Sequence, residues 1–131
     1  MNEQELLRVI EQAAIDSVTE LDLSGNNLTT LPPEIGKLIQ LKKLILGKHQ
    51  YDEYGYLAFP IGNNLSYLPT EIGLLTQLEE LEVAGNRLTS LPEEIGQLIN
   101  LRWLDLHNNQ LSSLPEEIGQ LVNLQTLHLG K

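Results

Sequence analysis

Aliphatic residues recur along this chain in a fixed order, with polar residues at constant places between them. The segments that begin at Val18, Leu78 and Leu101 align at every apolar position and share Asn and Leu-Pro at the same offsets. The five units begin at Val18, Leu41, Leu78, Leu101 and Leu124, so the successive steps are 23, 37, 23 and 23 residues. A fixed period of this length is typical of a solenoid, in which each repeat forms one coil that stacks on its neighbours.

Each unit predicts one short strand and one short helical turn. Two apolar residues flank a polar one, an alternation with period two that favours a strand, and stacked coils would place these strands in one parallel sheet. On the return limb a proline is followed by glutamate, isoleucine and glycine, which favours a helical or 3₁₀ turn that starts near the proline and ends near the glycine. The residues concerned are Pro32, Pro69, Pro92, Pro115, Gly36, Gly73, Gly96 and Gly119.

Asparagine follows the expected strand in four of the units. A carboxamide supplies two donor hydrogens and an acceptor, so at a turn it can satisfy backbone groups of the neighbouring coil. We therefore expect a structural ladder formed by Asn26, Asn63, Asn86 and Asn109.

Residues 2–17 lie outside the repeats and predict an amphipathic helix that caps the first coil. Asn2 with Glu5 three residues later forms a capping-box pattern, and apolar residues recur beyond it at helical spacing. The open end of a solenoid exposes apolar core, which such a helix would cover. The alternative is a helix that lies on a membrane surface, but Glu3, Glu5 and Glu11 outnumber Arg8, which favours the cap.

The consensus LxxLxLxxNxLxxLPxxIGxLxx resembles the leucine-rich-repeat family in its 23-residue LPxEIGxL form, from Val18 to Lys131. The resemblance implies an α/β solenoid with a parallel sheet on its concave face, short helical or 3₁₀ turns on its convex face and an N-terminal capping helix. One domain, 1–131, would comprise the cap 2–17, repeats 18–40, 41–77, 78–100 and 101–123, and the partial repeat 124–131.

The capping helix, the LPxEIGxL repeats and an insertion after the motif ILGK are also similar to the N-terminal repeats of bacterial Roco-type GTPases. That resemblance implies a regulatory segment of a larger multidomain protein, which would dock onto the downstream domains of the same polypeptide. The partial fifth unit leaves its leucines without a covering turn, so we expect either a piece of a longer protein or end-to-end self-association.

The composition narrows the expected partners and compartment. The net charge is −10, the largest basic group is Lys42, Lys43 and Lys48, and there is no cysteine. Because nucleic-acid binding needs a basic surface, we expect no such partner, and the lack of cysteine suits a reducing compartment. No secretory signal or apolar run of about 20 residues is visible, so we expect a cytoplasmic protein with no membrane contact.

The outward positions of the expected strands predict a concave binding surface. Trp103 is the best hot-spot candidate, because Trp and Arg are enriched at the energetic centres of interfaces and Arg102 lies beside it. The alternative is that Trp103 packs over Glu80 and Thr126 and only covers the sheet. The protein-binding candidates on the strands are Trp103, Arg102, Ile45, Lys43, Glu80, Glu82 and Asp105.

The 14-residue insertion, 49–62, reads HQYDEYGYLAFPIG and holds four of the six aromatic residues of the chain. Insertions in repeat proteins form loops on one rim, and aromatic loops often bind, so Tyr51, Tyr54 and Tyr56 are further protein-binding candidates. The alternative is a hairpin that folds on itself, with Phe59 tucked against the rim.

One group of residues could carry chemistry. Asp105, His107 and His128 fall on neighbouring expected strands, where they could bind a metal or form an acid–base pair, although His beside Asp on a solvated sheet is usually an ordinary hydrogen-bonded or charge pair. Phosphate-loop and dinucleotide motifs are absent, so we expect no cofactor and no enzyme. The sequence therefore favours a non-catalytic protein-interaction module, with the Roco-type regulatory segment and the metal or ligand site as alternatives.

Overall fold

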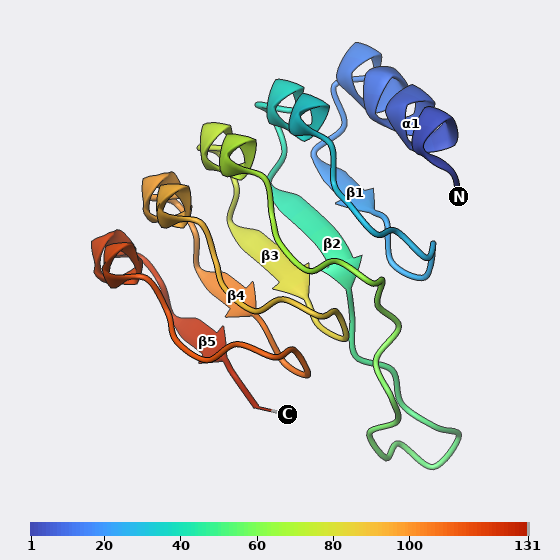
Figure 1. Cartoon of the computed structure of the whole chain (residues 1–131), viewed down its shortest axis with the longest axis vertical. Coiled ribbons are helices and arrows are strands. Elements are labelled where there is room, and N and C mark those ends of the chain that lie inside the picture. Colours follow the sequence, from blue (N-terminus) through green and yellow to red (C-terminus); the bar gives the residue numbers. More distant parts are fainter. Residues whose placement is uncertain (131) are drawn as a thin grey trace.

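Five parallel strands form one sheet along the concave face of the structure, a computed structural model that describes residues 1–130 (Figure 1). Their spatial order, β1-β2-β3-β4-β5, is the order of the chain. Each coil therefore pairs its strand with that of the next coil, which confirms the predicted solenoid. The last residue of the partial repeat 124–131 lies outside the described residues. The strands are β1 (Glu20–Asp22), β2 (Lys43–Gly47), β3 (Glu80–Val83), β4 (Trp103–Asp105) and β5 (Thr126–His128).

Within residues 1–130, four 3₁₀ helices run along the opposite, convex face (Figure 1). In each, the isoleucine N–H donates to the proline carbonyl three residues earlier, as Ile72 N does to Pro69 O at 3.0 Å. This is the tight hydrogen bond of a 3₁₀ helix, and it confirms the predicted turn after each Leu-Pro. The helices are η1 (Pro33–Lys37), η2 (Thr70–Leu74), η3 (Glu93–Gln97) and η4 (Glu116–Gln120).

Leucine fills the space between the sheet and the 3₁₀ helices. Leu44, Leu81 and Leu104 pair in register on neighbouring strands, and all three are fully buried. The same repeat position is therefore buried in coil after coil, which accounts for the abundance of leucine in the chain.

The asparagines after the strands form the expected ladder. The Asn63 carboxamide oxygen accepts from the backbone N–H groups of Asn26 (3.1 Å) and Leu28 (2.9 Å), while its NH₂ group donates to the carbonyls of Leu23 (3.0 Å) and Leu46 (2.9 Å). The Asn63 side chain thus ties its own turn to the preceding coil, and the same pattern recurs at Asn86 and Asn109. The Asn26 side chain, in the first coil, bonds only within its own turn.

The N-terminal segment forms α1 (Glu3–Ile15), which lies over the first coil (Figure 1). Asn2 and Glu5 make both hydrogen bonds of a capping box, which confirms the predicted helix start. Leu6, Ile10 and Ala13 are buried in the core, so the apolar face of the helix covers the end of the solenoid. Within residues 1–130, no helix is long and apolar enough to span a bilayer.

The insertion leaves and rejoins the solenoid at two glycines that touch the next coil. A Cβ atom on Gly47 would lie 1.7 Å from the carbonyl oxygen of Ala84, and one on Gly62 would lie 1.9 Å from that of Gly85. The β2–β3 register also shifts between Ile45 and Gly47. The backbones approach so closely here that only glycine fits.

Candidate functional site

Ion pairs join the charged residues of the first outward row of the concave sheet, which is Glu20, Lys43, Glu80, Trp103 and Thr126 in strand register. The Lys43 Nζ lies 3.5 Å from Glu20 Oε1 and 3.2 Å from Glu80 Oε2. The hydrogen bond with Glu80 raises the pKa of Lys43 above its ordinary value. Lys43 and Glu80 were predicted to bind a partner, but here they bond mainly to each other.

The second outward row is less accessible than its strand positions predict. It consists of Asp22, Ile45, Glu82, Asp105 and His128 in register. Only 7% of Ile45 and 1% of Asp105 are exposed, so the prediction that these two residues offer contact surface is wrong. Ile45 is flanked at strand spacing by Asp22 and Glu82, and Asp105 is covered by groups that bond its carboxylate.

Trp103 is half-buried and stacks on a histidine of the next strand. Its ring centroid lies 5.2 Å from that of His128, with 27° between the planes. The indole Nε1 is buried and has no acceptor within the described residues. The indole ring is therefore partly exposed and is packed against the His128 ring. Arg102, the residue before it, is exposed.

The Asp105 carboxylate is held by a residue of the insertion. His49 Nε2 lies 2.6 Å from Asp105 Oδ2, and the backbone N–H of His107 donates to Asp105 Oδ1 at 2.9 Å. The His49 ring lies 4.8 Å from the His107 ring and 6.3 Å from the His128 ring. The three histidines of the chain thus gather around one buried carboxylate.

This arrangement differs from the predicted metal or acid–base group. Among residues 1–130, no three or more His, Asp or Glu side chains are placed to hold a metal ion. Asp105 bonds the His107 backbone and the His49 ring, so its carboxylate is already occupied. Asp105, His107 and His128 therefore do not form the metal-ligand set that their spacing suggested.

Two carboxylates of this face, Glu82 and Asp22, have shifted pKa values. Burial raises the pKa of Glu82 above its ordinary value, against the attraction of Lys43, and the nearby Asp105 adds to the increase. Burial also acts to raise the pKa of Asp22, but hydrogen bonds from Lys48 and Ser24 outweigh it and hold that pKa below the ordinary value. Burial therefore disfavours the charged form of Glu82 on β3, whereas hydrogen bonds favour the charged form of Asp22 on β1.

The insertion forms an open hairpin that projects beyond the carboxyl ends of the strands (Figure 1). Antiparallel bridges join Lys48 to Ile61 at its base and Tyr51 to Leu57 further out. The hairpin that the sequence left as the alternative is therefore present, but Phe59 is 84% exposed, so the expectation that it tucks against the rim is wrong. Phe59 lines the edges of two grooves. One groove, a cavity of about 350 Å³, is lined by Leu57, Ala58, Phe59, Pro60, His107 and Asn108.

Most large side chains at the outer part of this hairpin are exposed. At least half of each of them is accessible to solvent, whereas Leu44 and Leu46, on the strand that leads into the insertion, are fully buried in the core. The exposed set is Tyr51, Tyr54, Tyr56, Leu57 and Phe59.

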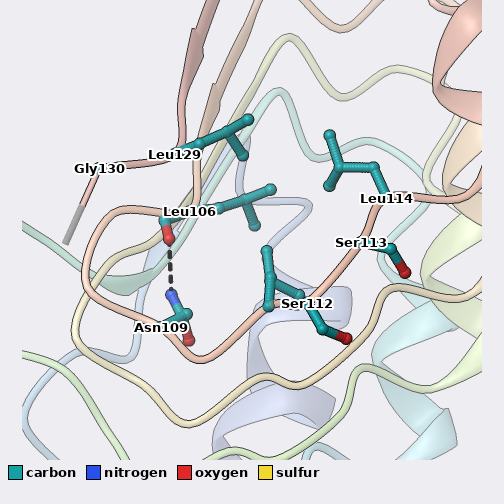
Figure 2. A pocket seen from close by; sticks show the side chains of 8 residues that line it. Leu106, Asn109, Ser112, Ser113, Leu114, Leu129 and Gly130 are labelled. Atoms are coloured by element: carbon teal, nitrogen blue, oxygen red, sulfur yellow. Dashed lines mark hydrogen bonds between the residues drawn. The ribbon is translucent and has the colours of Figure 1, made fainter.

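A separate apolar cavity of about 380 Å³ lies at the last coil (Figure 2). Leu106, Leu114 and Leu129 line it, together with the turn in which Asn109 donates to the Leu106 carbonyl. Leucine side chains supply the apolar part of its lining, and Asn109, Ser112 and Ser113 supply polar groups.

The sequence pattern did not point to His49 as part of the site. The residue lies in the insertion, outside the period that aligns strand positions, so no offset relates it to Asp105. One signal was available, because it is one of only three histidines and the first residue after the ILGK motif.

Comparisons with known proteins agree with the fold. Models described as leucine rich repeat match residues 17–38 and 76–131. An LRR protein of Leptospira interrogans is 41% identical in sequence with a TM-score of 0.59, over 92% of this chain and 34% of that one. The plant peptide hormone receptor RGFR1, solved in complex with RGF2, is 33% identical with a TM-score of 0.67, over 91% of this chain and 18% of that one. The chain thus spans about a third and about a fifth of these two structures. No curated protein matches significantly.

Proposed function

Because the chain is built of leucine-rich repeats and has the leucine-rich-repeat fold, we propose that it is a non-catalytic module that binds a protein partner. Proteins of this fold are commonly interaction modules, and the similar plant peptide hormone receptor was solved in complex with RGF2. The partner of this chain would contact the insertion hairpin together with Trp103 and Arg102. Because one fold can serve many functions, the proposal depends on these particular side chains and not on the fold alone.

The observation that carries the proposal is the exposed aromatic surface of the hairpin. Folded proteins rarely leave large aromatic side chains in water as a group, and such surfaces mark interaction sites. Tyrosine also contributes strongly to interfaces, because its ring gives contact area and its hydroxyl can form a hydrogen bond. The hairpin holds three exposed tyrosines and the exposed Phe59.

The remainder of the concave face supports a more limited contact than its strand positions suggest. Lys43 is paired with Glu20 and Glu80, and Ile45 and Asp105 are buried. Such groups offer a partner little unless existing bonds break. The accessible part is therefore the β4 and β5 side, around Trp103.

The first prediction concerns Trp103. Substitution Trp103→Ala should weaken binding of the partner by about tenfold or more, because a large interface aromatic is lost from its histidine support. The test captures a partner from cells that make this protein, identifies it by mass spectrometry and then titrates it by calorimetry. A double variant, Tyr54→Ser with Phe59→Ser, should lose at least as much.

The matched control is Val122→Ser, since Val122 is 81% exposed and lies beyond η4, away from the hairpin. This variant should bind as the parent does. Unchanged affinity in both the Trp103 and hairpin variants would contradict the proposed surface.

A second candidate is that the domain regulates a larger Roco-type GTPase in the cytoplasm by docking on its other domains. The supporting observation is the apolar cavity at the last coil, which a neighbouring segment could cover. The same cavity could instead support end-to-end self-association. Sedimentation of the isolated chain tests the latter, and a mass of one copy at all concentrations would contradict it.

A further inference from the structure

Two consecutive residues at the base of the insertion reach in opposite directions across the sheet. Lys48 Nζ lies 2.8 Å from Asp22 Oδ2 on β1, and His49 Nε2 lies 2.6 Å from Asp105 Oδ2 on β4. Both residues directly follow β2, where the chain leaves the solenoid. The start of the insertion therefore contacts β1 on one side and β4 on the other.

The two ties differ in burial and therefore in expected strength. The Lys48 and Asp22 side chains are 41% and 38% exposed, and a pair so open to water contributes little. Asp105 is 1% exposed, so its carboxylate loses its water and depends on the groups that bond it. One of its oxygens accepts from the His107 backbone N–H, and the other lies 2.6 Å from His49 Nε2. Removing His49 would leave a buried carboxylate oxygen without that partner.

The His49 side chain also crosses β3 to reach β4, since β3 lies between β2 and β4 in the sheet. It also lies near Glu82 of β3. Burial raises the pKa of Glu82, and the nearby His49 partly opposes this increase. The ring then lies beside His107 and His128, and His128 in turn supports Trp103. A row of rings thus connects the base of the hairpin to the tryptophan.

We propose that His49 is a positioning residue that fastens the base of the aromatic hairpin to the concave sheet through Asp105. Its effect is to hold the hairpin aromatics and the Trp103 ring in one composite surface, so that a single partner meets both. The effect on partner affinity rests on the proposed function. The fastening of the hairpin does not, because it is a property of the free chain.

The test compares His49→Leu with His49→Gln. Leucine removes the N–H donor, whereas the glutamine amide can place a donor near the position of Nε2. Hydrogen exchange followed by NMR reports on the hairpin through the Ala58 N–H, which donates to the Gln50 carbonyl at 2.9 Å. We expect His49→Leu to exchange this proton at least tenfold faster than the parent, and His49→Gln to restore most of the protection.

A strand amide and a second histidine serve as controls. The Leu106 N–H, which donates to the His128 carbonyl at 2.8 Å, should keep its protection in His49→Leu, as should the hairpin in His128→Gln. Unchanged Ala58 exchange in His49→Leu would overturn the fastening, and so would equal loss at Leu106, which indicates general unfolding. Failure of glutamine to restore protection would overturn the role of the N–H donor.

Partner affinity, measured on the same variants, separates the two claims. Weaker binding by His49→Leu, restored in His49→Gln, supports the composite surface. Faster hairpin exchange with unchanged affinity leaves the fastening in place and overturns the composite surface. Loss of affinity in the Trp103 variant but not in His49→Leu also overturns the composite surface, while the proposed function stands.

Discussion

The Asn86→Ala variant should lose about 3 kcal/mol of its free energy of unfolding, because it leaves several buried backbone groups without partners. The Asn86 oxygen accepts from the Leu65 N–H at 3.1 Å, and its NH₂ group donates to the carbonyls of Leu46 (3.1 Å) and Val83 (3.2 Å). Alanine can replace none of these bonds. Urea denaturation followed by circular dichroism measures the loss.

Asn64→Ala is the matched control for this result. Asn64 occupies the position after the ladder residue Asn63, is exposed, and makes no side-chain hydrogen bond within the described residues. Its replacement should change stability by less than about 0.5 kcal/mol. Similar losses in the two variants would show that the ladder does not hold the coils together.

Gly47→Ala should destabilise the fold by about 3 kcal/mol or more, or prevent it from forming, since the new methyl group meets backbone and not a mobile side chain. The Cβ atom would lie 1.7 Å from the Ala84 carbonyl oxygen and 2.8 Å from the Ala84 carbonyl carbon. Relief requires β2 and β3 to separate at the point where the insertion leaves. We expect lower solubility and a lower urea midpoint.

The comparison variant is Gly119→Ala. A Cβ atom there would meet nothing within 4 Å, so stability should stay the same or rise by up to about 1 kcal/mol. A Gly47→Ala protein as stable as the parent would contradict the close approach of the two coils at the insertion.

The repeat pattern predicted the parts of the fold that recur. Strand register, the turns after Leu-Pro and the asparagine ladder all follow from one coil, because each coil meets the same neighbours. Leu44, Leu81 and Leu104 show this most clearly, since their shared repeat position is fully buried in all three inner coils, whereas Leu21 and Leu127 of the end coils are partly buried. The capping helix followed from a separate, local signal at Asn2 and Glu5.

The features that the pattern did not predict depend on the insertion, because the insertion lies outside the repeat period. Asp105 has an outward strand position, yet His49 reaches across from the insertion and covers it. Phe59 stays exposed because the hairpin projects past the strand ends instead of folding back. The strand pattern placed Trp103 correctly on the outer face, but its stacking on His128 depends on side-chain rotation, which register alone does not determine.

The central claim, that a protein partner binds the hairpin, is tested most directly by photo-crosslinking in cells that make this protein. A photoreactive phenylalanine analogue replaces Phe59 in one variant and Val122, which is similarly exposed but distant, in a second. We expect one discrete protein adduct from position 59 and none from position 122. No adduct at position 59, or the same adduct from both positions, would contradict the claim.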